Sequence, residues 1–137
     1  MKKVKLIIVE NDEDEQLFMR EGFDQSGLFE ILIQVRNGDV LFKWLDTHHE
    51  QLPDLILSDL NMPGKNGYEI LSYLKCVPEY AEIPVIITST SSTNTIINKC
   101  LDAGAADYVV KPDTFIDYLP YAIELHRLIL EKNIVQL

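Results

Sequence analysis

A chain of 137 residues is long enough to bury a hydrophobic core without disulfide bonds or a structural metal, and it has the usual size of one domain. Its composition, 47% hydrophobic and 25% charged, excludes an extended disordered chain. The formal net charge of −10 disfavours nonspecific binding to a phosphate backbone, because such binding would have to overcome repulsion. We therefore expect a single domain over residues 1–137, with no separate output domain and no nucleic-acid partner.

The sequence carries no sign of secretion or membrane insertion. Its two cysteines, Cys76 and Cys100, lie in apolar helix-like segments, where a buried or half-buried thiol is the ordinary case. No signal-peptide pattern and no apolar run of membrane-spanning length is present. These features favour a reducing cytoplasm and predict no membrane partner.

Short apolar runs alternate with segments of helical periodicity along the chain. The runs cover residues 4–9, 31–35, 55–57, 85–87 and 108–110, and a segment of helical periodicity follows each one. Because the runs are almost continuously apolar, they predict a parallel sheet covered by helices on both faces. Right-handed connections then follow from strand twist. The expected fold class is α/β, a doubly wound sheet of five strand–helix units.

Polar residues stand where the expected strands end. Glu10, Asn11 and Asp12 follow the first strand, and Asp59, Ser89 and Lys111 follow the third, fourth and fifth. The carboxyl ends of parallel strands meet at one edge of the sheet, which is where such folds bind ligands. We therefore expect these side chains to lie close together.

The chemistry of this set indicates a phosphoryl site with a hard metal ion. Carboxylate and carbonyl oxygens suit Mg²⁺, and the softer histidine and thiolate ligands are absent from these positions. A carboxylate such as Asp59 can attack phosphorus if a metal and a lysine offset the charge on the phosphoryl oxygens. Lys111 offers a compact positive charge, and the Ser89 hydroxyl can donate a hydrogen bond.

Four blocks, in order and correctly spaced, together resemble the receiver-domain family of two-component signalling. They are Leu6 to Asp12, Pro53 to Pro63, Pro84 to Ser89, and Gly104 to Pro112. The resemblance covers nearly the whole chain. It implies a flavodoxin-like (βα)5 sheet with the strand order 2-1-3-4-5.

The resemblance also implies a role for each matching residue. Asp59 corresponds to the phosphoacceptor, Lys111 and Ser89 to the phosphate-binding residues, and Ser89 with Tyr108 to the switch pair whose aromatic ring turns inward on phosphorylation. The implied Mg²⁺ ligands are Glu10, Asn11, Asp59 and the backbone carbonyl of Asn61.

The chain departs from the family at Asn11, where an acid that ligates magnesium is usual. An amide supplies at most a neutral oxygen, so this substitution predicts weaker magnesium binding. Asp12 could take the place of that acid if the loop changed its register. The spacing of strand and loop nevertheless favours Glu10 and Asn11 as the equivalent pair.

These observations predict a stand-alone response regulator rather than an enzyme, with at most self-catalysed phosphotransfer and autodephosphorylation. The implied partners are a histidine kinase or phosphotransfer protein and a downstream protein target. One alternative is a degenerate receiver that acts as a phosphorylation-independent interaction module. Another is an aspartyl-nucleophile phosphatase resembling the haloacid dehalogenase-like enzymes, but these have Asp-x-Asp after the first strand.

The last helix is expected to begin near Asp117, to hold Pro120 in its first turn and to run almost to Leu137. It carries two apolar stripes. One contains Leu119, Ala122, Ile123, His126, Ile129 and Leu130, and the other contains Tyr121, Leu125 and Leu128. Because a helix on a sheet needs one such stripe, we expect the second to contact a partner or to form a homodimer.

Overall fold

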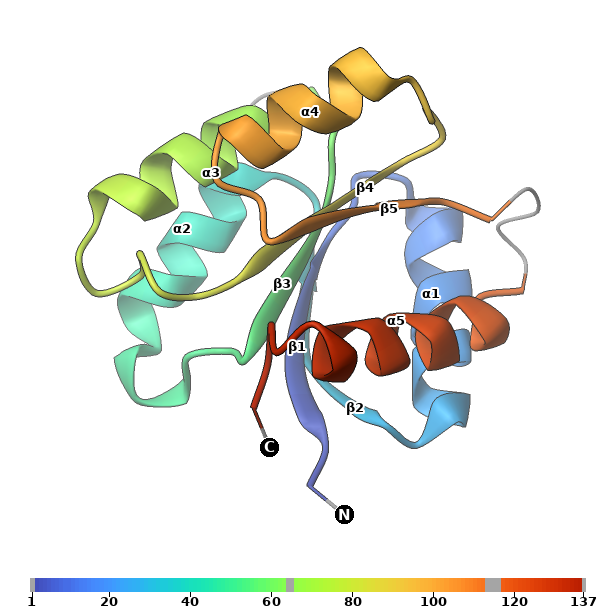
Figure 1. Ribbon diagram of the computed structural model, residues 1–137. Helices are drawn as coiled ribbons and strands as arrows, with labels where there is room; N and C mark the ends of the chain where they lie inside the picture. Colours follow the sequence, from blue (N-terminus) through green and yellow to red (C-terminus); the bar gives the residue numbers. More distant parts are fainter. Residues whose placement is uncertain (1, 64–65, 113–116, 137) are drawn as a thin grey trace.

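The structure, a computed structural model, describes residues 2–63, 66–112 and 117–136. Five strands form one parallel sheet in the spatial order β2-β1-β3-β4-β5, which confirms the predicted flavodoxin-like order (Figure 1). The strands are β1 (Val4–Val9), β2 (Phe29–Val35), β3 (Leu55–Asp59), β4 (Val85–Ser89) and β5 (Asp107–Val110). Each predicted apolar run is a strand, and the second and fifth begin one or two residues earlier than expected.

A helix follows each strand. The helices are α1 (Glu13–Ser26), α2 (Gly38–Thr47), α3 (Gly67–Cys76), α4 (Asn94–Asp102) and α5 (Leu119–Glu131), and a short 3-10 helix, η1 (His49–Gln51), follows α2. Local sequence sets several of these limits. The Asp12 side chain accepts from the Glu15 backbone N and so caps α1, which ends where Gly27 adopts a left-handed φ of 71°.

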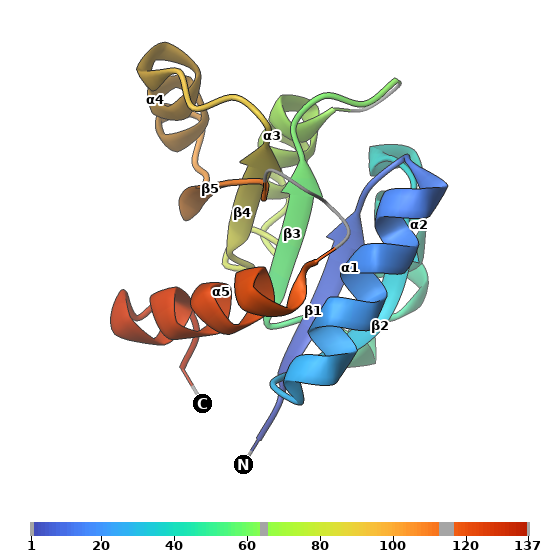
Figure 2. The same cartoon turned by 90° about the vertical axis from the view of Figure 1, so that its right-hand side faces the viewer.

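The sheet lies between two layers of helices, each with its own hydrophobic core. Side chains alternate between the faces of a strand, so Ile7 and Ile56 belong to the core beneath α2, α3 and α4, while Leu6 and Leu57 belong to the core beneath α1 and α5. Figures 1 and 2 show α1 and α5 together on one face of the sheet. Apart from Lys5 and Ser58, the three central strands carry no polar residue until their carboxyl ends.

The last helix differs from the sequence-based expectation. It begins at Leu119 with Pro120 in its first turn, as predicted to within two residues, but it ends at Glu131. Asn133 then adopts a positive φ of 56°, and Val135 folds back into the core with 6% exposure. The extent predicted for this helix was therefore too long, because the apolar end of the chain is buried by a turn and not by further helix.

The prediction that the second apolar stripe of α5 contacts a partner is also wrong. Tyr121 and Leu125 are buried within this chain, at 8% and 1% exposure, and Leu128 is half-buried. The outward face of α5 instead carries Ile123 and Leu130 beside an ion-paired group, in which Arg127 contacts both Glu124 and Glu131. The helix packs against both the sheet and the neighbouring α1, so it buries two stripes rather than one.

The two cysteines differ in their exposure to solvent. Cys100 is buried as expected, whereas Cys76, at the end of α3, is exposed. No helix in the described part of the chain has both the length and the apolar character needed to cross a bilayer.

Helix α1 lies close to the start of α5 at Gly22. A Cβ atom added there would lie 2.5 Å from the Tyr118 carbonyl carbon and 2.7 Å from the Leu119 backbone nitrogen. Both atoms belong to the backbone, so no side-chain rotation could relieve the clash. Gly22 therefore sets the spacing between the two helices.

We predict that Gly22→Ala lowers the free energy of unfolding by about 1–3 kcal/mol, because overpacking would outweigh the better helix propensity of alanine. Urea unfolding measures the change. Gln25→Ala, at an exposed position of the same helix, is the control and should be nearly neutral. An equal or higher stability for Gly22→Ala would contradict the contact.

Candidate functional site

The end of β1 places two acids in different roles. Glu10 is 2% exposed, and one of its carboxylate oxygens accepts from the Asp12 backbone N at 3.1 Å. The Asp12 side chain is exposed and caps α1 through the Glu15 backbone N at 2.9 Å. The loop thus turns Glu10 inward and uses Asp12 as the helix cap.

Asp59 is the last residue of β3 and is 8% exposed. The start of α3 lies directly against it, because Gly67 donates its backbone N–H to the Leu60 carbonyl at 3.0 Å. A Cβ atom at Gly67 would lie 3.2 Å from the Asp59 carbonyl oxygen and 3.1 Å from the Leu60 Cα. Glycine therefore lets α3 pack closely behind the carboxylate.

Lys111, just after β5, joins these acids. Its ammonium Nζ lies 2.9 Å from Glu10 Oε1, 3.4 Å from Asp59 Oδ1 and 2.5 Å from Glu15 Oε2. The Lys111 side chain is only 8% exposed, so these pairs are poorly screened by water. The topology thus brings the ends of three strands and the first turn of α1 to one cation.

Two acids of this cluster, Glu10 and Asp59, hold protons more tightly than the same acids in water. Burial, with a smaller contribution from the Asp59 charge, raises the pKa of Glu10 from 4.5 to about 7 despite its bond to Lys111. Burial likewise raises the pKa of Asp59 above its usual value, although Lys111 opposes this. The three carboxylates raise the pKa of Lys111 and more than offset its own desolvation. Burial, which the Lys111 ammonium offsets only in part, therefore favours the protonated forms of Glu10 and Asp59.

Thr88 and Ser89 are adjacent on β4 but face opposite sides of the sheet. The Thr88 hydroxyl donates to the Val109 carbonyl oxygen and accepts from the Tyr121 hydroxyl, both at 2.8 Å. Thr88 is therefore part of the packing under α5. Ser89, at the end of the strand, accepts from the Ser91 backbone N at 3.3 Å.

Tyr108 is 8% exposed and packs in the core beneath α4. Its hydroxyl donates to the Ser91 carbonyl oxygen at 2.7 Å. The ring therefore lies inward in this structure. Its proposed movement as a switch stays a prediction.

The other residues predicted at the metal lie at the margin of the cluster. Asn11 is exposed and lines a shallow hollow between α1 and α2 with Gln16, Gln34 and Arg36, among others. Asn61 is exposed and lies two residues beyond β3. In the described part of the chain, no three Asp, Glu, His or Cys side chains are arranged as metal ligands.

Glu15 is a residue of the cluster that the sequence did not indicate. Its side chain is 13% exposed, in contact with Lys111, and it also accepts from the Tyr118 hydroxyl at 3.2 Å. Glu13 and Asp14 carry the same charge in the same turn, so the sequence holds no signal that separates Glu15 from them.

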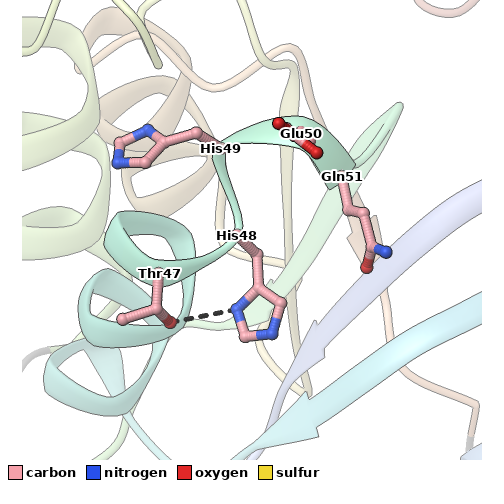
Figure 3. Close-up of a pocket in the computed structure, with 5 residues that line it drawn as sticks. All are labelled: Thr47, His48, His49, Glu50 and Gln51. Atoms are coloured by element: carbon pink, nitrogen blue, oxygen red, sulfur yellow. Dashed lines mark hydrogen bonds between the residues drawn. The ribbon is translucent and has the colours of Figure 1, made fainter.

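A second hollow lies away from this cluster, at the C-terminal end of α2 (Figure 3). In it, His48 Nδ1 lies 3.0 Å from Thr47 Oγ1, and the His48 imidazole stacks on Trp44. Helix α2 runs back from the carboxyl edge of the sheet, so this hollow is at the opposite edge from Asp59. Its lining residues are Thr47, His48, His49, Glu50 and Gln51.

The raised pKa of Glu10 predicts how stability depends on pH. The folded protein binds this proton more tightly than the unfolded chain, so stability is lost as pH rises from about 4.5 to about 7. In metal-free buffer at pH 8, Glu10→Gln should therefore raise the free energy of unfolding by about 1–2 kcal/mol. The gain should shrink below pH 5.

Urea unfolding at pH 4.5 and pH 8, with EDTA present, measures this difference. Glu21→Gln, at an exposed site on α1, controls for the change in net charge. A Glu10→Gln variant that is less stable than wild type at pH 8 would show that the bond to Lys111 outweighs the burial of the charge.

Comparisons with known proteins fit this geometry. The curated relatives include the rice (Oryza sativa) two-component response regulator ORR8, 42% identical over 74 residues, and ARR3 of Arabidopsis thaliana, 42% identical over 64 residues. The alignments span 54% and 47% of this chain. They cover 60% of ORR8 and 28% of ARR3, so the match is to part of each relative.

Solved structures match over most of the chain. The phosphorylated cyanobacterial phytochrome response regulator RcpA has a TM-score of 0.76 and 28% identity, with 95% of this chain and 93% of RcpA covered. The Mn²⁺-bound response regulator Rcp1 has a TM-score of 0.72 and 25% identity, with 92% and 91% covered. A family model described as the response regulator receiver domain matches residues 6–119. The chain therefore belongs to the response regulator receiver domain family.

Proposed function

We propose that this receiver domain accepts a phosphoryl group on Asp59 in the presence of Mg²⁺, and that the modification switches a protein-binding face. The observation that carries the proposal is the buried Lys111 ammonium held between the carboxylates of Asp59 and Glu10. Such an arrangement supplies a nucleophile and a positive charge for the phosphoryl oxygens in a site with little water. Phosphorylated RcpA provides a related precedent.

The donor chemistry at this edge fits a hard divalent cation. Glu10 and Asp59 offer carboxylate oxygens in a cluster where three acids share one lysine, and Asn61 would add its backbone carbonyl. Mg²⁺ would neutralise charge on the phosphoryl oxygens as they approach Asp59. Asn11 would contribute at most a neutral amide oxygen. The Mn²⁺-bound form of Rcp1 shows that a related receiver binds a divalent metal.

Each side chain of the site then has its own role in the phosphoryl transfer. An oxygen of Asp59 attacks phosphorus, the bond from phosphorus to the donor breaks, and the donor keeps the electron pair and takes up a proton. Lys111 donates to a phosphoryl oxygen, and the Ser89 hydroxyl can donate to another. Tyr108 responds through packing beneath α4. The protein is a phosphoacceptor in this scheme, with at most self-catalysed transfer and autodephosphorylation.

The donor in this proposal is a histidine kinase or a phosphotransfer protein, and the output is a contact with a downstream protein or a second copy. The apolar stripe once assigned to that contact is buried in the monomer, so α5 offers only Ile123 and Leu130 as exposed large apolar side chains. A cytoplasmic location stays a prediction from the sequence.

The first test is phosphorylation by a small-molecule phosphodonor with Mg²⁺, read by intact mass. We expect wild type to gain one phosphoryl group and Asp59→Asn to gain none, because the variant lacks the nucleophilic carboxylate. A gain that persists in Asp59→Asn would refute the assignment. No gain in wild type at any magnesium concentration would favour the phosphorylation-independent interaction module instead.

The second test concerns the weaker Mg²⁺ binding predicted from the amide at Asn11. A unit charge pair about 4 Å apart attracts by roughly 4 kcal/mol at an effective dielectric near 20, and dehydration offsets much of this. We expect Asn11→Asp to strengthen Mg²⁺ binding on the order of 10- to 100-fold, measured by calorimetry. Gln25→Glu, which adds one negative charge at an exposed position of α1, controls for net charge. Equal affinities of wild type and Asn11→Asp would place Asn11 away from the metal.

A further inference from the structure

We propose that Glu15 is a positioning residue that holds Lys111 in the unphosphorylated protein and must release it when Asp59 is phosphorylated, thereby signalling to α5 through Tyr118. The proposal rests on the function proposed above. It adds a competing anion within the site and a defined route from the site to one helix.

The geometry shows that the Lys111 ammonium is fully engaged. An ammonium has three hydrogens to donate, and three carboxylates surround this one. Glu15 lies nearest at 2.5 Å, Glu10 is at 2.9 Å and Asp59 is farthest at 3.4 Å. A phosphoryl group on Asp59 would take over the third and longest of these contacts, so Lys111 would then be shared between that group and the two carboxylates that lie closer to it.

Charge favours the loss of the Glu15 contact. Three carboxylates already face one ammonium, and an aspartyl phosphate adds further negative charge beside them. Glu10 is 2% exposed and is tied to the loop by the Asp12 backbone N. The Glu15 side chain is more exposed, at 13%, and stands on the first turn of α1 where it can rotate toward water.

Release of Glu15 would change the contacts at the start of α5. Tyr118 is the residue before α5, is 1% exposed and donates its hydroxyl to Glu15. Its ring also packs on Phe23 of α1 and on Tyr121 of α5. Because a buried hydroxyl that loses its acceptor is costly, Tyr118 and the first turn of α5 should rearrange when Glu15 moves.

The opposing possibility is that Glu15 is a magnesium ligand that makes up for Asn11. The two roles predict opposite kinetics. A carboxylate that holds Lys111 slows phosphorylation, so its removal speeds the reaction and leaves the magnesium requirement unchanged. A metal ligand supports phosphorylation, so its removal slows the reaction and raises the magnesium requirement.

The experiment measures phosphorylation rates with a small-molecule donor over a range of Mg²⁺ concentrations. We expect Glu15→Gln to react about 3- to 10-fold faster than wild type at saturating Mg²⁺, with half-saturation within twofold. Glu13→Gln, an exposed acid of the same turn, should stay within twofold of wild type in both. A slower Glu15→Gln, or one equal to Glu13→Gln, overturns the proposal.

A second measurement does not depend on phosphorylation, so it separates failure of this proposal from failure of the proposed function. In metal-free urea unfolding, Glu15→Gln should lower the midpoint in wild type but raise it in a Lys111→Gln background, where Glu15 only repels the other acids. If Lys111→Gln does not fold, the cycle is run with Glu10→Gln present. Additive effects would mean that Glu15 does not hold Lys111, whether or not Asp59 is phosphorylated.

The route to α5 has its own readout. In amide NMR spectra without phosphate, Glu15→Gln should shift the signals of residues 118–122, apart from Pro120, which has no amide proton, toward the positions seen in phosphorylated wild type. Tyr118→Phe, which keeps the ring and removes the hydroxyl, should shift the same signals. Unchanged signals at residues 118–122 in Glu15→Gln would refute the coupling to α5.

Discussion

The buried ammonium of Lys111 is the interaction on which the rest of the site depends. Three carboxylates converge within 3.4 Å of it, and without it they would face one another in a poorly solvated space. Even with it, the pKa values of Glu10 and Asp59 stay raised, so the site costs stability. That cost must be offset elsewhere in the fold, and in the proposed function the same electrostatic imbalance would favour the binding of a divalent cation and a phosphoryl group.

The two hydrophobic cores supply the rigidity that keeps these charges together. Strands β1, β3 and β4 are buried on both faces, so their carboxyl ends are fixed in register, and the charged residues begin where the apolar positions stop. Because side chains alternate between the two faces of a strand, the adjacent hydroxyls of β4 also lie in different surroundings. Thr88 binds Tyr121 in the core under α5, while Ser89 stays at the strand end. A shift by one residue along β4 would exchange them.

Much of this arrangement could be predicted from the sequence, because apolar runs and strand-end polar residues are local features. The strand-end positions of Asp59 and Lys111 belong to this group, whereas the strand order was predicted from the resemblance to the receiver-domain family. Glu15 could not be identified in this way, since its neighbours Glu13 and Asp14 have the same charge and only the packing of α1 turns one of them inward. The prediction that the second apolar stripe of α5 contacts a partner was wrong for a related reason. Helix α5 contacts α1 as well as the sheet, and helical periodicity does not show how many elements a helix packs against.

The close approach at Gly22 has a mechanical consequence. With the α1 backbone resting on Tyr118 and Leu119, α5 has no free space in which to slide or roll independently at that point. Any displacement of the first turn of α5 must carry the middle of α1 with it or open a gap in the core between them. The two helices should therefore move together. A displacement of one helix would then change the surface that the other offers to a bound protein.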